Sequence, residues 1–396
     1  MGGLDKVGGV TRAPTLAELV AAVERRYPPR WAVDGDAIGL VTGDPEDTVE
    51  RVLYAVDPVR AVVDEAIRSG VQALVVHHPL LYRPVSRVAA DEPKGRVIHD
   101  LIRHGIALYV AHTNADSPAY GVSESMAVAL GLTDLRPLVA DPVDPLDKIV
   151  VFVPHDDEQK LIDALAEAGA GEIGIYGRAA FVTAGEGTFR PGPGANPTIG
   201  SVGEIEVVAE SRVEMVMRRD RRESVIAALR AAHPYEEPAF DVVELGAWDA
   251  DRGEGRVGSL PAPMSLRTFA DEVAAALPAT AMGARVSGDL DREVSTVGVL
   301  GGAGDSRLDA ALRAGVDVYV TSDLRHHPAS EFREHDGPAL IDVPHWATEW
   351  TWLPVAQRVL GDDLAADGLV IESSVSRICT DPWKHRAPSP GAHEDL

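Results

Sequence analysis

A short, mostly apolar run from residue 71 to 76 stops at two adjacent histidines, His77 and His78. The run follows Gly70 and is rich in β-branched residues, so residues 72–76 predict a buried strand rather than a helix. The histidines then lie at the carboxyl end of a strand. In open α/β sheets this edge binds ligands, and imidazole is the commonest metal-ligating side chain. The pair alone fits a metal site and a locally hydrogen-bonded strand end equally well.

The pattern before this strand alternates helices and strands. Residues 15–27 place apolar side chains at helical spacing behind a capping threonine, which predicts an amphipathic helix. Acidic residues in the glycine-punctuated stretch 31–43 could form solvated turns or face a pocket, and turns are the simpler explanation. Residues 51–56 predict a strand and residues 58–69 a helix that ends at Gly70. Together with the run at 72–76 they form a βαβ unit, which favours a parallel sheet.

The same pattern recurs in the second half of the chain. Residues 296–302 predict a strand, residues 306–314 a helix ended by Gly315, and residues 317–321 another strand. One constant offset aligns Gly70 with Gly315 and the flanking elements without a gap. We infer an internal duplication.

A further strand follows in each copy and ends in a histidine with a carboxylate four residues later: His112 with Asp116, and His345 with Glu349. If the chain turns helical after Pro344, His345 and Glu349 share one face, about 5–6 Å apart between Cβ atoms, close enough to bind one metal. Each pair alone fits an exposed ion pair, but coincident sites at equivalent strand ends favour a pocket between the halves. Nitrogen and oxygen ligands without thiolates suit zinc, iron or manganese.

Composition narrows the classes of function. The 396 residues suffice for two or three domains. A net charge of -25 and a pI near 4.8 argue against nucleic-acid binding, which needs basic patches. The single cysteine, Cys379, excludes an internal disulfide framework and a cysteine-rich zinc site, so we expect a cytoplasmic protein. No stretch has the pattern of an export signal or a membrane span.

The segment between the halves has its own pattern. The segment predicts the order strand, helix, strand, strand, helix, strand, which is the ferredoxin-like arrangement. The predicted ranges, in that order, are 148–153, 157–168, 178–183, 214–217, 222–232 and 238–244. The stretch 189–197 is a loop rich in glycine and proline, without the features of a phosphate loop. His233 and Glu236 could bind a metal here, but a proline-containing turn explains them more simply.

We therefore predict an α/β protein whose duplicated α/β halves form one discontinuous metal-binding domain, interrupted by an inserted ferredoxin-like domain. The expected regions are residues 1–143 for the first half, 146–246 for the insert, 250–383 for the second half and 384–396 for a disordered tail.

Four stretches together resemble the Nif-three-like family of dinuclear-metal proteins, whose members often carry the name GTP cyclohydrolase 1 type 2. They are residues 77–80, 111–122, 321–327 and 341–349. The resemblance extends from about residue 16 to residue 382, and the insert resembles the PII-like or CutA-like domain of longer members. It implies a homohexameric ring with two divalent metal ions per chain.

Carried over by motif, the resemblance implies five metal ligands: His77, His78, Asp116, His345 and Glu349. Glu349 would bridge the two metals. It also implies a catalytic pocket with three further members, in which the histidines would be proton shuttles: His112, Asp323 and His327. Ala115 stands where the family usually has leucine, and Pro344 replaces a small residue before His345. Neither departure removes a ligand.

The activity implied by the resemblance is hydrolysis of GTP to 7,8-dihydroneopterin triphosphate and formate, which begins with attack at C8 of guanine. Two alternatives stay open: a ring-shaped metal-binding regulatory scaffold without turnover, and a dinuclear-metal phosphoesterase. The partners expected are further copies of the chain and a nucleotide or other small-molecule substrate. We expect no membrane partner.

Overall fold

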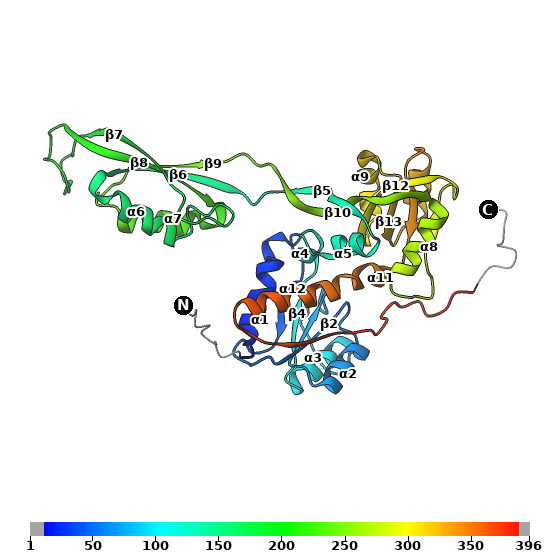
Figure 1. The fold of residues 1–396 in the computed structure, drawn as a ribbon. Helices are drawn as coiled ribbons and strands as arrows, with labels where there is room; N and C mark the ends of the chain where they lie inside the picture. Colours follow the sequence, from blue (N-terminus) through cyan, green and yellow to red (C-terminus); the bar gives the residue numbers. More distant parts are fainter. Residues whose placement is uncertain (1–11, 388–396) are drawn as a thin grey trace, which may run out of the picture. The chain divides into compact units, whose positions relative to one another are not determined.

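The structure, a computed structural model, describes residues 12–387 (Figure 1). The chain divides into two compact units, both of mixed α/β structure. One unit combines Met1–Asp141 with Asp251–Leu396, and the other is Pro142–Ala250. Of the tail expected at 384–396, residues 388–396 lie outside the described part. No helix within residues 12–387 is long and apolar enough to cross a bilayer.

The first sheet of the larger unit has the strand order β1-β4-β3-β2-β15. Its strands are β1 (Gly39–Thr42), β2 (Arg51–Ala55), β3 (Ala73–Val76), β4 (Ala107–Val110) and β15 (Glu372–Val375). All neighbours are parallel except β1, which pairs antiparallel with β4. The inner strands are nearly continuous apolar runs, as expected for parallel strands covered on both faces.

Helices cover both faces of this sheet. One face packs against α2 (Arg60–Ser69) and α3 (Pro93–Arg103). The other packs against α1 (Leu16–Arg26) and α12 (Trp352–Ala366). Helix α1 begins with the capping box predicted from Thr15, whose side chain accepts from the backbone of Glu18.

The second sheet has the strand order β11-β14-β13-β12-β10-β5. Its strands are β5 (Thr133–Pro142), β10 (Asp249–Ser265), β11 (Arg285–Ser287), β12 (Glu293–Ala303), β13 (Val318–Ser322) and β14 (Ala339–Asp342). The central triplet β12, β13 and β14 is parallel. Helix α8 (Leu266–Ala276) packs on one face, and α9 (Leu308–Ala314) and α10 (His326–Arg333) contribute to the core of the other.

The helix before β3 and the helix before β13 end in the same way. Gly70 follows α2 with a φ of 62°, and Gly315 follows α9 with a φ of 67°. Both values lie in the left-handed region that favours glycine, so each residue ends its helix and redirects the chain into a buried strand.

A shared core joins the two sheets of the larger unit. It includes residues of α5 (Val122–Ala129), α11 (His345–Trp350) and α12. The fully buried Trp352 donates from Nε1 to the Tyr27 hydroxyl at 3.1 Å, and Tyr27 donates to the Tyr120 carbonyl at 3.0 Å. The short helix α4 (Thr113–Asp116) is fixed by Asn114, whose amide donates to the Tyr27 carbonyl at 2.6 Å.

The unit Pro142–Ala250 is a four-stranded antiparallel sheet with the order β7-β8-β6-β9. Its elements are β6 (Leu146–Pro154), α6 (Glu158–Glu167), β7 (Phe181–Phe189), β8 (Glu206–Arg218), α7 (Arg222–Ala232) and β9 (Phe240–Glu244). The two helices lie on one side of the sheet (Figure 1). The order of helices and strands matches the sequence prediction.

Strands β7 and β8 are longer than the sequence predicted. The prediction placed a strand at 214–217, whereas β8 begins at Glu206. The extra residues pair with β7 in a ribbon whose side chains are mostly exposed. An exposed ribbon lacks the regular apolar alternation by which a half-buried strand is found.

Candidate metal centre

Three strand ends bring four histidines together in the larger unit. His77 and His78 directly follow β3, and their backbone N–H groups bond the carbonyls of Ala55 and Val56 at 3.2 and 2.9 Å. His112 follows β4 and immediately precedes α4. His345 follows β14 and is the first residue of α11. Because the strands are parallel, their carboxyl ends lie at one edge of each sheet.

Every one of these four rings is held by an oxygen at Nδ1. The pairs are His77 with the Ala111 carbonyl at 2.9 Å, His78 with Asp57 at 2.8 Å, His112 with Asp36 at 2.9 Å and His345 with Asp323 at 2.7 Å. An oxygen at Nδ1 keeps a proton on that nitrogen and leaves Nε2 of the neutral ring as the ligand atom. The four imidazoles are therefore oriented as metal-ligating histidines usually are.

The carboxylate of Glu349 lies close to the Nε2 atoms of three of the histidines. Its side chain is buried, on the same face of α11 as His345. Oε1 lies 2.8 Å from His345 Nε2 and 3.4 Å from His77 Nε2. Oε2 lies 3.0 Å from His78 Nε2, yet it has no partner with the geometry of a hydrogen bond. Each oxygen thus faces imidazole nitrogen, and one of the two is buried without a hydrogen bond.

Asp116, the last residue of α4, lies close to one of these histidines. Its Oδ1 lies 3.6 Å from His77 Nε2. Removal from water raises the pKa of the Asp116 carboxyl to about 6, against the opposing positive charge of His77. A carboxylate in this position is costly without a cation beside it.

The ionic balance of the cluster depends on Glu349. Burial opposes its ionisation, but the charges of the surrounding histidines outweigh burial and hold its pKa well below the usual range. Burial likewise opposes charging of His78 and His345, but Glu349 and the acids at Nδ1 raise their pKa values to about 11 and about 10. Without a metal, protonated imidazoles neutralise the buried carboxylate at neutral pH.

The donor atoms fit divalent metal ions. Ligand atoms of His77, His78 and His112 lie within 4.8 Å of one another, and so do those of His78, His345 and Glu349. Nitrogen and carboxylate donors at such spacing suit zinc, iron or manganese. The buried Glu349 Oε2, which has no hydrogen bond, is the kind of atom that a bound cation would satisfy. The residues therefore fit the group that the sequence suggested.

The remaining catalytic candidates take different positions. His112 lies closer to the centre than predicted, since its ring belongs to one of the two groups of candidate ligands. Among the residues that the structure describes, Asp323 bonds the centre through His345 Nδ1 alone. His327 is exposed on α10 and its ring contacts that of His326, with centroids 5.1 Å apart. Within the described part of the chain, no hydrogen bond or ion pair links His327 to the centre.

The sequence did not single out Asp36 and Asp57, which hold His112 and His78. Asp36 belongs to the glycine-punctuated stretch for which turns were the simpler explanation; its carboxylate instead accepts from Thr113 and His112. Asp57 directly follows the residues predicted as the first strand of the βαβ unit. The position just after a parallel strand was its only available signal.

A cavity of about 350 Å³ adjoins the centre. Its lining includes His77, His112, Asp116, His345 and Glu349. The remaining lining comes from Trp31, Val33, Thr113, Ser117, Ser123, Asp141, Glu254, Gly255, Leu300, Gly301, Gly302, Ala303 and Ser306. The cavity gives a small molecule access to the side chains that would hold the metals.

Comparisons with known proteins match nearly the whole chain. The GTP cyclohydrolase 1 type 2 homolog of Mycobacterium tuberculosis is 50% identical over 371 residues, which cover 93% of this chain and 96% of the relative. The homolog of Bacillus subtilis is 40% identical over 334 residues, 83% of this chain and 88% of the relative. A crystal structure of a Bacillus cereus protein related to NIF3 superposes with a TM-score of 0.78 at 36% identity, covering 94% of this chain and 99% of that one.

The family model described as Duf34/NIF3 (NGG1p interacting factor 3) matches residues 14–382. The sequence resemblance is thereby confirmed, and the chain belongs to the DUF34/NIF3 family.

Proposed function

We propose that the protein is a hydrolase with a dinuclear metal centre. One observation carries the proposal: four neighbouring imidazoles are each fixed by an oxygen at Nδ1, and three of them face the buried carboxylate of Glu349. The ligands are His77, His78, Asp116, His345 and Glu349. Zinc, iron and manganese all suit this set.

The distances favour a division of the ligands between two ions. His77 Nε2 lies 3.6 Å from Asp116 Oδ1, and His78 Nε2 lies 3.0 Å from Glu349 Oε2. His345 Nε2 lies 2.8 Å from the other oxygen of Glu349, Oε1. Glu349 reaches both groups, which is the position of a bridging carboxylate. Divalent ions bound here would act as Lewis acids that polarise a substrate oxygen and lower the pKa of water.

The residues around the ligands position the ligands and transfer protons. Asp57 and Asp323 keep the rings of His78 and His345 in the ligating tautomer. His112 lines the cavity and is fixed by Asp36, so its Nε2 can exchange a proton with a bound molecule. His327, exposed on α10, is left out of the proposed arrangement.

The substrate class follows the name of the relatives. We propose that GTP enters the cavity with its guanine ring toward the ligands, that water attacks C8, and that formate and 7,8-dihydroneopterin triphosphate are the products. Divalent ions bound at the centre would add positive charge to a chain that is acidic as a whole, which would favour an anionic nucleotide.

We further propose that the larger unit is a duplicated α/β domain that assembles as a homohexameric ring, and that the unit Pro142–Ala250 is a ferredoxin-like, PII/CutA-like insert. The glycine caps after α2 and α9 and the two parallel triplets support the duplication. The order β7-β8-β6-β9, with both helices on one side, supports the ferredoxin-like assignment. A cytoplasmic location fits the single cysteine.

The experiment is to load the purified protein with zinc, iron or manganese and incubate it with GTP. Formate release that disappears in Glu349→Gln and persists in a variant of an exposed acid, Glu331→Gln, supports the cyclohydrolase. Phosphate release in place of formate supports the phosphoesterase. Two bound metals without either product would mean a regulatory scaffold, for which a cavity in the unit Pro142–Ala250, lined by Glu210 and Tyr235, is the specific support.

A further inference from the structure

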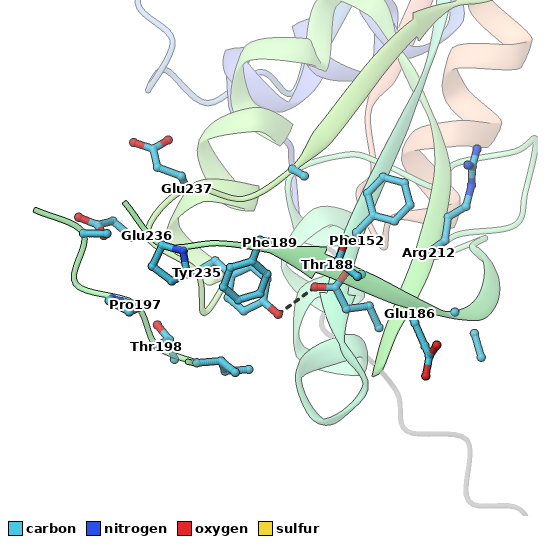
Figure 2. A pocket seen from close by; sticks show the side chains of 18 of the residues that line it. Phe152, Glu186, Thr188, Phe189, Pro197, Thr198, Arg212, Tyr235, Glu236 and Glu237 are labelled. Carbon is cyan, nitrogen blue, oxygen red and sulfur yellow. Dashed lines mark hydrogen bonds between the residues drawn. The ribbon is translucent and has the colours of Figure 1, made fainter. Parts of the chain in front are cut away.

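The unit Pro142–Ala250 contains a cavity of about 580 Å³ that the proposed hydrolase does not use. It lies between the β7–β8 ribbon, the stretch 191–199 and the segment that follows α7 (Figure 2). Its volume is within the range of small-molecule sites. All of its lining belongs to this one unit, and it shares no lining residue with the cavity at the candidate metal centre.

Aromatic and apolar side chains form much of the wall. Tyr235 and Phe189 lie side by side, with ring centroids 5.6 Å apart, and Phe152 lines the cavity farther along (Figure 2). Pro197 and Ile199 add apolar surface from the glycine- and proline-rich stretch. Such a wall favours a ligand with an apolar or aromatic body.

Glu210 supplies a buried charge. Its residue is only 8% exposed, and one carboxylate oxygen accepts from the Tyr235 hydroxyl at 2.8 Å. Burial first, and then the hydrogen bond with Glu210, raise the pKa of Tyr235, which therefore stays a donor. Within residues 12–387, no lysine, arginine or histidine forms an ion pair with Glu210, and its second oxygen has no hydrogen-bond partner. A cation beside this carboxylate would supply the countercharge that these residues do not provide.

Gly187 makes room for this carboxylate. A Cβ atom at Gly187 would lie 2.0 Å from Glu210 Oε2. Gly187 lies within β7, where it pairs with Val208. Glycine inside a strand weakens the strand and often marks a site where another group approaches the backbone closely. The missing side chain lets the carboxylate rest against the strand and stay within the cavity wall.

The other charges of the cavity leave it negative. Glu236 and Glu237 lie at one end, and Glu186 and Arg212 lie at the other (Figure 2). Arg212 already bonds Glu214 at 2.9 Å and is partly exposed to solvent. An anionic ligand would meet four carboxylates against one guanidinium, whereas a cation would meet Glu210 and aromatic faces.

We propose that this cavity binds a small organic cation, an aromatic or apolar body bearing a protonated amine. The ammonium pairs with Glu210, and the body packs against Tyr235 and Phe189. The site is a place where a small amine can act on the protein without entering the metal centre.

The test measures binding of three matched probes to the full-length protein by isothermal titration calorimetry. 2-Phenylethylamine is the cation, 2-phenylethanol the neutral analogue and phenylacetate the anion. We expect the amine to bind about tenfold or more tightly than the alcohol, since hydrogen bonds to charged groups are the stronger ones. Phenylacetate should bind weakest. Phenylacetate binding as tightly as the amine, or no binding of any probe at millimolar concentration, would overturn the proposal.

Variants locate the site. Glu210→Gln keeps the size and the acceptor for Tyr235, so affinity for the amine should fall about tenfold while affinity for the alcohol stays the same. Gly187→Ala should also weaken the amine because its methyl group displaces the carboxylate. The control is Glu223→Gln, an exposed position on α7 outside the cavity. Circular dichroism and metal content verify that each variant is folded. Unchanged amine affinity in folded Glu210→Gln would refute the assignment.

Discussion

Asp323 Oδ2 lies 2.7 Å from His345 Nδ1, and the opposite nitrogen of the same ring lies 2.8 Å from Glu349 Oε1. The imidazole is thus held between two carboxylates. The hydrogen bond from His345 lowers the pKa of Asp323, which stays ionised near neutral pH. Asp323 has a φ of 56°, in the left-handed region that few residues other than glycine adopt. The next residue, Leu324, donates its N–H to Asp342 at 3.0 Å, which fixes this turn. Asp323 is therefore a positioning residue for His345.

Asp323→Ala should lower metal affinity about 10- to 100-fold, the usual effect of losing the carboxylate behind a ligating histidine. Competition with a chromophoric chelator measures the affinity. Full occupancy should return at high metal concentration, because all five ligands remain. Asp309→Ala, at an exposed position on α9, is the matched control. An affinity equal to that of the control would show that Asp323 does not orient the ring.

Metal binding should release protons at neutral pH. The pKa values of His78 and His345, about 11 and about 10, keep both rings protonated at pH 7 in the metal-free protein. A ligating imidazole must be neutral, so each chain should release about two protons on binding, and affinity should rise with pH until those pKa values are passed. Calorimetry in buffers with different ionisation enthalpies counts the protons. A heat independent of the buffer would contradict this charge state.

Gly302 should be sensitive to a single added methyl group. It has a φ of 77°, and a Cβ atom there would lie 2.9 Å from Glu349 Oε1 and 3.5 Å from His345 Nε2. Gly302→Ala should therefore displace the proposed bridging carboxylate and reduce metal content. Gly283→Ala is the control, because Gly283 has a similar φ of 62° but open space around its Cβ position. Both variants carry the backbone strain, so equal metal loss in the two would mean that strain, not the contact, is responsible.

The sequence predicted those parts of the fold that depend on local pattern. The apolar run before His77 and the glycine after α2 define β3 and its histidines without any distant contact. The residues that support the rings could not be found in this way. Asp36 meets His112, and Asp57 meets His78, only after strands distant in the chain pair in one sheet. Hydrogen bonds between residues so far apart in the chain produce no periodic pattern in the sequence.

Two strands were missed for a related reason, and one of them lies at a sheet edge. Strand β1 falls in the stretch 31–43, which was assigned to turns, and pairs only with β4. Strand β10 contains two prolines, Pro261 and Pro263, and its register with β12 is interrupted between Ser259 and Met264. Proline lacks the N–H group that a sheet ladder needs, so these residues mark the interruption and obscure the strand in the sequence.

Removal of the insert should leave the metal centre intact. The ends of the unit Pro142–Ala250 lie together, since Leu245 donates its N–H to the Leu146 carbonyl at 3.0 Å. A short glycine-serine linker in place of residues 146–245 can therefore close the chain. We expect the deletion protein to keep its metals, its oligomeric state and its secondary structure, measured by elemental analysis, light scattering and circular dichroism. A folded deletion protein without metal would show that the insert completes the site.

The last prediction separates the roles of Glu349 and Asp116. Glu349 lies near three imidazole nitrogens, whereas Asp116 Oδ1 lies 3.6 Å from one, His77 Nε2. A bridging carboxylate offsets the repulsion between two cations about 3.5–4 Å apart, and the neutral amide of Glu349→Gln keeps the shape without the charge. This variant should lose occupancy at both positions, whereas Asp116→Asn should mainly empty one. Elemental analysis of the folded proteins gives the metal-to-chain ratio. Two metals per chain in Glu349→Gln would refute the bridging role, and the loss of both in Asp116→Asn would mean that Asp116 also serves both ions.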